Sequence, residues 1–336
     1  MKPIFLTLVL ACCQHAYAQD AQSPFSSQLN VLLDMTKASG DTLERDSAVR
    51  ALTTLEGQYQ PSDQWLVFGN LKAFRGQNGE EITENIQGIS NIDAADRFNK
   101  IYELYLQWQV ATDTRLKCGQ VDANLEFAFV PVAGSFISPP LGITPTAIAL
   151  PTYYDPAMSC SVFYEPKQGF QWMGGVFAGR DHLNFAEQFV VAEGRYVTEK
   201  SQVSYGYWTH NGHWELLTEE PHSIAIDGWY INYQRRISES TTLFFVLSRL
   251  DDAVDMLQEH RMAGVVTDLP WQGQQWGLMV SQAAQRHDGD EWLVETYWQW
   301  PVSEQFFIQP VVQYINHAGE ELDTSYLFTL RASLTF

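Results

Sequence analysis

Long hydrophobic runs are almost absent from this sequence. After one early apolar run, residues 4–11, it contains no stretch of the roughly 18 apolar residues that a membrane-spanning helix requires. This absence excludes a helical membrane protein. The early run lies between Lys2 and the small-residue motif Ala16-Tyr17-Ala18, which is the layout of a cleaved secretory signal. We therefore expect residues 1–18 to be a signal peptide and residues 19–336 to form the mature domain of an exported protein.

Cysteine is also scarce. Of the four cysteines, Cys12 and Cys13 fall in the predicted signal peptide, so the mature chain keeps Cys118 and Cys160, too few to staple a chain of this size. An alternative interpretation takes the segment VLAC as a lipobox with Cys12 as a lipidated first residue, but Leu10 fits that motif poorly. Neither a C-x-x-C pair nor a metal-type cluster occurs in the sequence, and we expect no metal and no cofactor. We expect Cys118 and Cys160 to face outward, either as free thiols or as a cross-strand pair.

Positive charge is the third shortage. Only 20 Lys and Arg residues stand against 40 Asp and Glu, which gives a formal net charge of −20 at pH 7. A surface this acidic disfavours nucleic acid as a partner, because the phosphate backbone is itself anionic. Aromatic residues are abundant instead, with 11 Trp and 15 Tyr. Their number fits the core of any large β-protein, so their positions have to decide what they do.

Alternation of apolar and polar residues recurs along the whole mature chain and predicts β-strands. Most of the alternating segments have about the 9 to 11 residues that a tilted strand needs to cross a bilayer. We count sixteen such segments, at residues 28–38, 48–60, 64–74, 97–110, 114–122, 157–165, 170–177, 188–198, 201–210, 223–237, 241–249, 258–267, 275–284, 291–300, 305–315 and 324–336.

The connections between these segments alternate in length. Short connections such as PSD, ATD, PKQG, EKS, SES and PVSE take turns with longer pieces, notably residues 75–96, 123–156 and 316–323. Short turns on one rim and long loops on the other are typical of an outer-membrane β-barrel. A soluble β-sandwich would explain the alternation within each segment, but it does not explain this pattern of connections.

Aromatic residues gather beside the short connections, as expected for a girdle at the level of the lipid head groups. These residues are Tyr59, Trp65, Trp108, Trp300, Phe306 and Phe336. Packing in a soluble core would account for their number but not for this placement.

The two faces of each predicted strand differ in polarity. One face carries apolar stripes, namely Tyr102, Leu104, Leu106, Trp108 and Val110 in one strand and Trp292, Val294, Trp298 and Trp300 in another. The opposite faces carry Arg50, Thr54, Glu56 and Gln58, then Glu103, Tyr105, Gln107 and Gln109, and finally Glu291, Glu295 and Gln299. In a barrel these polar faces would enclose a water-filled lumen.

Five segments carry a resemblance to a known family. They are QGISNIDA (residues 87–94), KIYELYLQWQ (100–109), RLKCGQVDANLEFAF (115–129), the long run from GSFISPP to FYEP (134–166), and IQPVVQYINHAGEE (308–321). The chain resembles the carbohydrate-selective porins of the OprB family. The resemblance implies an all-β, monomeric barrel of sixteen strands with short periplasmic turns, long extracellular loops and an inward-folded constriction loop. It implies passive diffusion of sugars and other small hydrophilic solutes across the bacterial outer membrane, in contact with lipid and lipopolysaccharide.

Charged residues at inward positions are the candidates for the lining of the pore. A narrow lumen lined by carboxylates, guanidinium groups and amides can replace the hydration shell of a neutral sugar in passing. We predict that the pore is lined by Arg50, Glu103, Arg115, Lys117, Asp122, Glu193, Arg195, Glu295 and Arg331. For each of them the alternative is a salt bridge within the barrel wall. Residues 124–155, rich in Gly and Pro, are expected to fold inward as the constriction, with an ordinary surface loop as the alternative.

Acidic residues concentrate in the long connections and are expected to face the medium. They are Glu80, Glu81, Glu84, Asp93 and Asp96 in one loop, Asp251, Asp252 and Asp255 in another, and Glu320, Glu321 and Asp323 in a third. At this position they would bias the entry of ions without deciding which sugar passes.

Two other functional classes stay open. An outer-membrane hydrolase would need a nucleophile and a base on neighbouring strands, whereas His182, His210, His213 and His317 fall in loops or at strand ends without a recognisable serine motif. We therefore do not expect an enzyme. A secreted or outer-membrane glycan-binding β-protein without transport would use the aromatic residues as stacking platforms, but it would not need sixteen strands of bilayer-crossing length.

Overall fold

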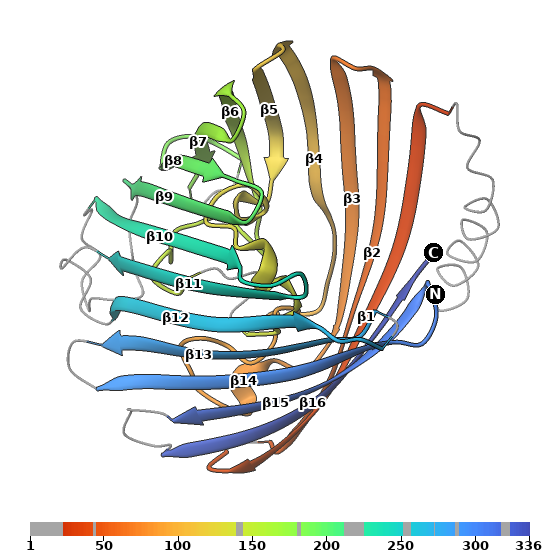
Figure 1. The fold of residues 1–336 in the computed structure, drawn as a ribbon, viewed down its shortest axis with the longest axis vertical. Helices are drawn as coiled ribbons and strands as arrows, with labels where there is room; N and C mark the ends of the chain where they lie inside the picture. Colours follow the sequence, from red (N-terminus) through yellow and green to blue (C-terminus); the bar gives the residue numbers. More distant parts are fainter. Residues whose placement is uncertain are drawn as a thin grey trace.

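Sixteen antiparallel strands form a closed barrel in the computed structural model (Figure 1). The structure describes residues 23–42, 45–138, 144–179, 183–211, 225–250, 257–271, 273–285, 289–316 and 323–336. The strands are β1 (Phe25–Gly40), β2 (Ser47–Ser62), β3 (Trp65–Gly76), β4 (Phe98–Ala111), β5 (Thr114–Val121), β6 (Ala157–Lys167), β7 (Phe170–Ala178), β8 (Gln188–Val197), β9 (Ser201–His210), β10 (Ile226–Arg236), β11 (Thr241–Leu250), β12 (Leu257–Asp268), β13 (Gln275–Gln285), β14 (Asp290–Pro301), β15 (Phe306–Asn316) and β16 (Thr324–Thr335). All sixteen predicted strands are confirmed, with bounds that agree within three residues.

Each strand pairs with its neighbours in sequence, and β1 closes the barrel by pairing with β16. At the seam, the backbone N–H of Leu29 donates to the carbonyl of Phe336 at 3.0 Å, and the N–H of Phe336 donates back at 2.8 Å. Closure satisfies the backbone groups that an open edge would leave unpaired in lipid. The predicted signal peptide, with Cys12 and Cys13, lies outside the described residues.

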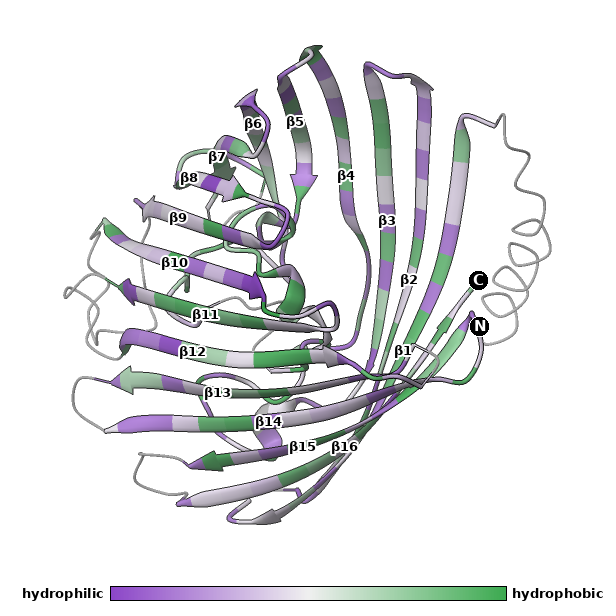
Figure 2. Cartoon of the chain, viewed as in Figure 1, coloured by the Kyte–Doolittle hydropathy of each residue, from purple (hydrophilic) through white to green (hydrophobic). Residues whose placement is uncertain are grey.

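The outer face of the barrel is apolar and the strands alternate in polarity along their length (Figure 2). The exposed large apolar side chains include the predicted girdle residues Tyr59, Trp65, Trp108, Trp300 and Phe336, whose exposed fractions range from 36% to 53%. The predicted outward placement of these aromatic residues is confirmed. Within the described part of the chain, the structure contains no helix of sufficient length and apolarity to span a membrane.

One predicted facing is wrong. Asn70 on β3 pairs with Glu103 on β4, whereas the next residue, Leu71, pairs with Ile101. Tyr102 is therefore the extra residue of a β-bulge, and its fully buried side chain points inward beside that of Glu103. The outward stripe of β4 begins instead with Ile101. Alternation predicts facing only where pairing is regular, and a bulge shifts the pattern by one residue.

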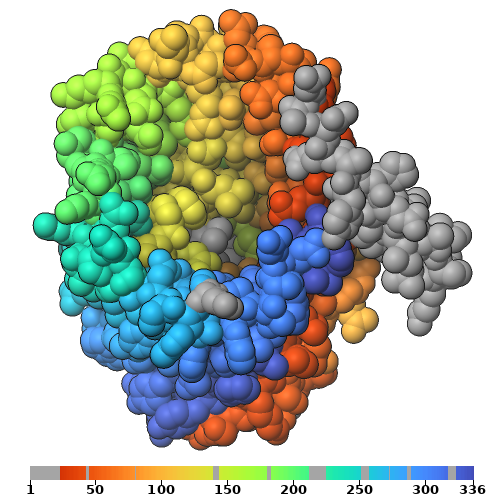
Figure 3. Space-filling view, turned by 45° about the vertical axis from the view of Figure 1, so that its right-hand side comes forward, coloured from red at the N-terminus to blue at the C-terminus, as the bar shows by residue number. Residues whose placement is uncertain are grey.

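The long segment between β5 and β6 lies inside the barrel, as predicted. Its described residues include two short 3₁₀ helices, η2 (Ala123–Leu125) and η3 (Pro131–Ser135). Phe136 is fully buried, and its ring lies 4.9 Å from that of Tyr297 and 5.7 Å from that of Phe244 on the inner wall. In Figure 3 the yellow atoms of this segment lie within the hollow of the barrel. The interior is consequently divided between packed loop and open space.

A second long connection, between β3 and β4, also folds inward. It begins with the 3₁₀ helix η1 (Gly79–Glu81), and Ile82, Ile89 and Ile92 are buried. Burial of these apolar side chains favours the inward position over one in the medium. The carboxylate of Asp93 pairs with the guanidinium of Arg50 on β2, so the prediction that Asp93 lies on the outer rim is wrong.

The other acidic residues assigned to the rim have mixed outcomes. Glu84, Asp96 and Asp323 are exposed, and Glu81 pairs with Arg45 at 2.6 Å. The side chain of Glu80 and the residues Asp251, Asp252, Asp255, Glu320 and Glu321 lie outside what the structure describes.

Candidate pore constriction

The nine residues predicted to line the pore all lie on the inner side of the barrel. Eight of them are on strands, and Asp122 directly follows β5. The carboxylate of Asp122 accepts a hydrogen bond from the backbone N–H of Asn124 at 3.0 Å and so caps the N-terminus of η2. They do not form one ring. The structure divides them among contacts with the two inward loops, and their role in passage stays a prediction.

Three of the predicted cations converge on Glu126, a carboxylate of the constriction loop that the sequence analysis missed. Arg115 and Lys117 on β5 approach its carboxylate at 3.3 and 3.0 Å, and Arg195 on β8 donates to its backbone carbonyl at 2.7 Å. Burial by itself would raise the pKa of Glu126, but Lys117 and Arg115 outweigh it and hold this pKa below its ordinary value. Glu126 is therefore charged under ordinary conditions and ties the loop to two parts of the wall.

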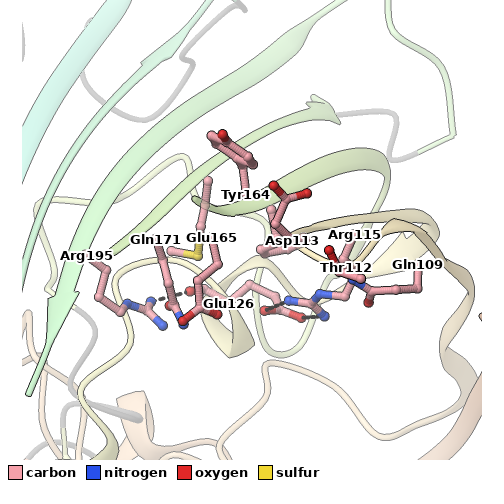
Figure 4. Close-up of a pocket in the computed structure, with 11 residues that line it drawn as sticks. Gln109, Thr112, Asp113, Arg115, Glu126, Tyr164, Glu165, Gln171 and Arg195 are labelled. Atoms are coloured by element: carbon pink, nitrogen blue, oxygen red, sulfur yellow. Dashed lines mark hydrogen bonds and ion pairs between the residues drawn. The ribbon is translucent and has the colours of Figure 1, made fainter. Parts of the chain in front are cut away.

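A cavity of about 310 Å³ lies beside this cluster, near the short turns of the barrel (Figure 4). Arg115 and Arg195 project into it from opposite sides, with the loop residue Glu126 between them. The remaining lining residues are Gln109, Thr112, Asp113, Phe163, Tyr164, Glu165, Gln171 and Met173. The guanidinium carbon of Arg115 also lies 3.8 Å from the centre of the Phe163 ring. This cavity brings hydrogen-bond donors, acceptors and an aromatic surface together at the end of the pore that the short turns define.

Wall carboxylates hold the inward loops through backbone N–H groups. Glu295 accepts from the N–H groups of Ile137 and Ser138 at 2.8 and 2.9 Å, and Glu193 accepts from the N–H of Ala128 at 3.0 Å. Glu193 also accepts from the hydroxyl of Tyr230 at 2.6 Å. Both glutamates are covered by the loop they hold, with exposed fractions of 0% and 2%. In this structure they position the loop that narrows the pore.

The loop between β3 and β4 is held in the same manner. Glu291 on β14 accepts from the N–H groups of Ile86 and Gln87 at 2.7 and 3.2 Å. On the same side of the barrel, Arg331 on β16 forms a bidentate pair with Asp34 on β1, both distances being 2.8 Å, and donates to the side chain of Asn91 at 2.7 Å. Asp34 was missed in the sequence because a single acidic residue in an alternating strand gives no sign of its partner.

Glu103 belongs to a compact polar group near the bulge. It accepts hydrogen bonds from the amide of Asn70 at 3.0 Å and from the backbone N–H of Asp122 at 3.1 Å. The hydroxyl of Tyr102 donates to the carboxylate of Asp122. The bulge therefore turns Tyr102 toward a polar partner at the start of the constriction loop.

Cys118 on β5 and Cys160 on β6 lie directly opposite each other and form a disulfide. Of the two alternatives predicted from the sequence, the structure shows the cross-strand pair. Their neighbours Lys117 and Ser161 are buried on the inner face, so the disulfide faces outward as predicted. It joins the two strands from which the constriction loop leaves and to which it returns.

Comparisons with known proteins agree with the resemblance seen in the sequence. Residues 257–336 match the model of the OprB family, described as carbohydrate-selective porins, which confirms the resemblance for that part of the chain. No curated protein sequence matches.

Solved structures show the same fold. The high-pH structure of OprB from Pseudomonas putida matches with a TM-score of 0.83 at 12% identity, covering 93% of this chain and 94% of that one. Its low-pH structure matches with a TM-score of 0.64 at 10% identity, covering 100% and 98%. OmpT of Vibrio cholerae, in a trimer form, matches with a TM-score of 0.63 at 9% identity, covering 93% and 99%. The predicted fold of an outer-membrane porin is confirmed.

Proposed function

We propose that this protein is a porin of the bacterial outer membrane, through which sugars and other small hydrophilic solutes diffuse passively. The observation that carries this proposal is a closed sixteen-strand barrel with an apolar outer face and a constriction loop held inside it by wall carboxylates. The family match over residues 257–336 supports sugars as the solutes.

The cavity between Arg115, Glu126 and Arg195 supplies the chemistry that such passage needs. A sugar hydroxyl both donates and accepts, and this cavity offers guanidinium donors beside carboxylate and amide acceptors. The charged groups already have partners in one another, so a neutral sugar gains only the hydrogen bonds that it exchanges with them and is bound weakly. Weak binding of this kind lets the solute leave as readily as it enters.

A glycan-binding protein without transport is the alternative function, and passage of solute through the barrel distinguishes a porin from it.

One pair of side chains has the residue types of a hydrolase site. The buried ring of His260 contacts the hydroxyl of Ser281 at 2.7 Å, but the inward loop covers this pair through Gln87. No described side chain partners the other ring nitrogen of His260. His210 lies at the end of β9, and His182, His213 and His317 lie outside the described residues. We therefore assign no enzymatic role.

Lipid and lipopolysaccharide are the proposed neighbours of the outer face. At its long-loop end, Arg249 and Arg261 flank Glu259 at 3.7 and 2.5 Å, with side chains 45% and 54% exposed. Guanidinium groups exposed at this level can approach the anionic head groups of the membrane. We propose a monomer, following the sequence resemblance, and cross-linking of the protein in intact envelopes measures this directly.

Liposome swelling tests the proposed function. Purified protein whose folded state is verified by heat-modifiable gel migration is reconstituted into liposomes and exposed to glucose, a disaccharide and a large dextran. We expect rapid swelling with glucose, slower swelling with the disaccharide and none with dextran. A folded barrel that binds glucose but gives the same swelling as empty liposomes would establish the glycan-binding alternative instead.

A further inference from the structure

A group of aromatic side chains lies inside the barrel at the end of the pore opposite the short turns. β4 starts there at Phe98, whose ring lies 6.0 Å from that of Phe74 on β3. Tyr153 and Tyr154, from the end of the constriction loop, lie 6.3 and 6.4 Å from Phe98. Phe74 is buried, whereas Phe98, Tyr153 and Tyr154 are each partly exposed. Three ring surfaces from two separate segments are thus accessible at the extracellular entrance.

A charged pair borders these rings. The ammonium group of Lys100 lies 2.6 Å from the carboxylate of Asp155 and within 4.9 and 5.5 Å of the ring centres of Phe98 and Tyr154. The hydroxyl of Tyr153 donates to the backbone carbonyl of Ile92 at 2.9 Å, which fixes its ring against the other inward loop. A donor and an acceptor therefore lie at the edge of an aromatic platform that is held from both sides.

The same combination recurs along one wall of the lumen. The ammonium group of Lys72 lies 3.5 Å from the ring centre of Tyr102, and that of Lys117 lies 4.0 Å from Tyr105. Six of the seven cation–ring contacts among the described residues belong to β3, β4, β5, β6 and the end of the constriction loop. This series ends at Phe163 and Arg115 in the cavity near the short turns. Rings beside cations thus recur along this wall, but Tyr102 and Lys117 are buried, so the accessible rings of the entrance form a separate group.

A pyranose sugar matches this chemistry. One face of the ring presents C–H groups that pack on an aromatic surface, while its hydroxyl groups lie at the edge and need donors and acceptors. Passage through a channel is fastest when several weak sites share the binding, because a solute then enters without being retained.

We propose that Phe98, Tyr153 and Tyr154, together with Lys100, form an entry site on which a pyranose sugar stacks, separate from the cavity at Arg115. This inference rests on the proposed function and adds a binding site at the extracellular end of the same pore.

Block of ionic current by D-glucose in planar bilayers tests the entry site. Glucose is added on the extracellular side of single channels of the wild type and of Tyr154→Leu, Phe98→Leu and Tyr154→Phe. Both leucine variants keep an apolar side chain and remove the ring, and we expect the half-blocking concentration to rise about three- to tenfold. Tyr154→Phe keeps the ring and is expected to stay near the wild-type value. Phe328→Leu, which removes an exposed ring from the outer face, is the matched control and should not change the block.

The outcomes of this experiment separate the entry site from the proposed function. No glucose-dependent block in the wild type would contradict the proposed function. Block in the wild type with unchanged half-blocking concentrations in both leucine variants would overturn the entry site and leave the proposed function intact. A rise in Phe328→Leu equal to that in Tyr154→Leu would also overturn it, because the effect would then not depend on the lumen.

Discussion

Replacing Glu295 by glutamine is expected to release the constriction loop from the barrel wall while the barrel stays closed. The Glu295 carboxylate accepts from the N–H groups of Ile137 and Ser138, and from the amide of Gln313 at 3.1 Å. A glutamine keeps one acceptor oxygen and turns an NH₂ group toward the second N–H, which leaves a buried donor unpaired. Loss of one charge-assisted hydrogen bond together with an unpaired buried donor costs about 3 kcal/mol. That cost raises the fraction of channels with an undocked loop on the order of 100-fold.

Single-channel conductance and limited proteolysis measure this release. Glu295→Gln is expected to show frequent excursions to a larger conductance, and faster cleavage within the constriction loop of the detergent-solubilised barrel. Glu304→Gln, which neutralises an exposed carboxylate in a short turn, is the matched control. If Glu295→Gln behaves like Glu304→Gln in both assays, the hydrogen bonds of Glu295 do not hold the loop and the argument from them is refuted.

Three further predictions follow from the contacts of the pore. Replacing both mature cysteines by serine should leave sugar flux unchanged in folded barrels, because the disulfide faces away from the lumen; a loss of liposome swelling would contradict this. Because the pKa of Glu126 is lowered in the folded state, its stabilising contacts are present above its ordinary pKa near 4.5 and are lost as the pH falls through the lowered value. Conductance should therefore be steady from neutral pH to about 5 and change at lower pH, and Glu126→Gln should lack this acid transition. Neutralising Glu84 and Asp96 on the rim should reduce cation preference without changing the order of sugar permeabilities, whereas Arg115→Gln should change that order in liposome swelling; the reverse result would refute the assignment of sugar choice to the lumen.

The strands could be read from the sequence because their signal is local. Alternation of polarity with a period of two requires only that a strand has one face in lipid and the other inside the barrel. Trp292 and Trp298 outside, and Glu291 and Glu295 inside, follow directly from it. The one wrong facing, that of Tyr102, came from a bulge, which depends on the pairing of β4 with β3 and leaves no mark in the alternation.

The interior was only partly predictable. The Gly and Pro content of residues 124–155 indicated an irregular segment that could enter the barrel, and it does. The inward position of residues 77–97 was missed, although Ile82, Ile89 and Ile92 form an apolar signal that could have indicated burial. The acidic residues around these isoleucines indicated a loop in the medium, and this second signal led to the wrong prediction.

The partners of the charged residues were decided only by the tertiary structure. Sequence alternation placed Arg115, Arg195 and Arg331 on the inner face, but it could not assign Glu126 to the first two or Asp34 to the third. The contacts of Arg195 with Glu126 and of Arg331 with Asp34 join residues that are distant along the chain, whereas Arg115 and Glu126 are 11 residues apart. All three contacts form only where barrel closure and loop docking bring the side chains together. Local periodicity fixes which side of the wall a side chain occupies, whereas the depth, curvature and loop path that select its partner are properties of the closed barrel.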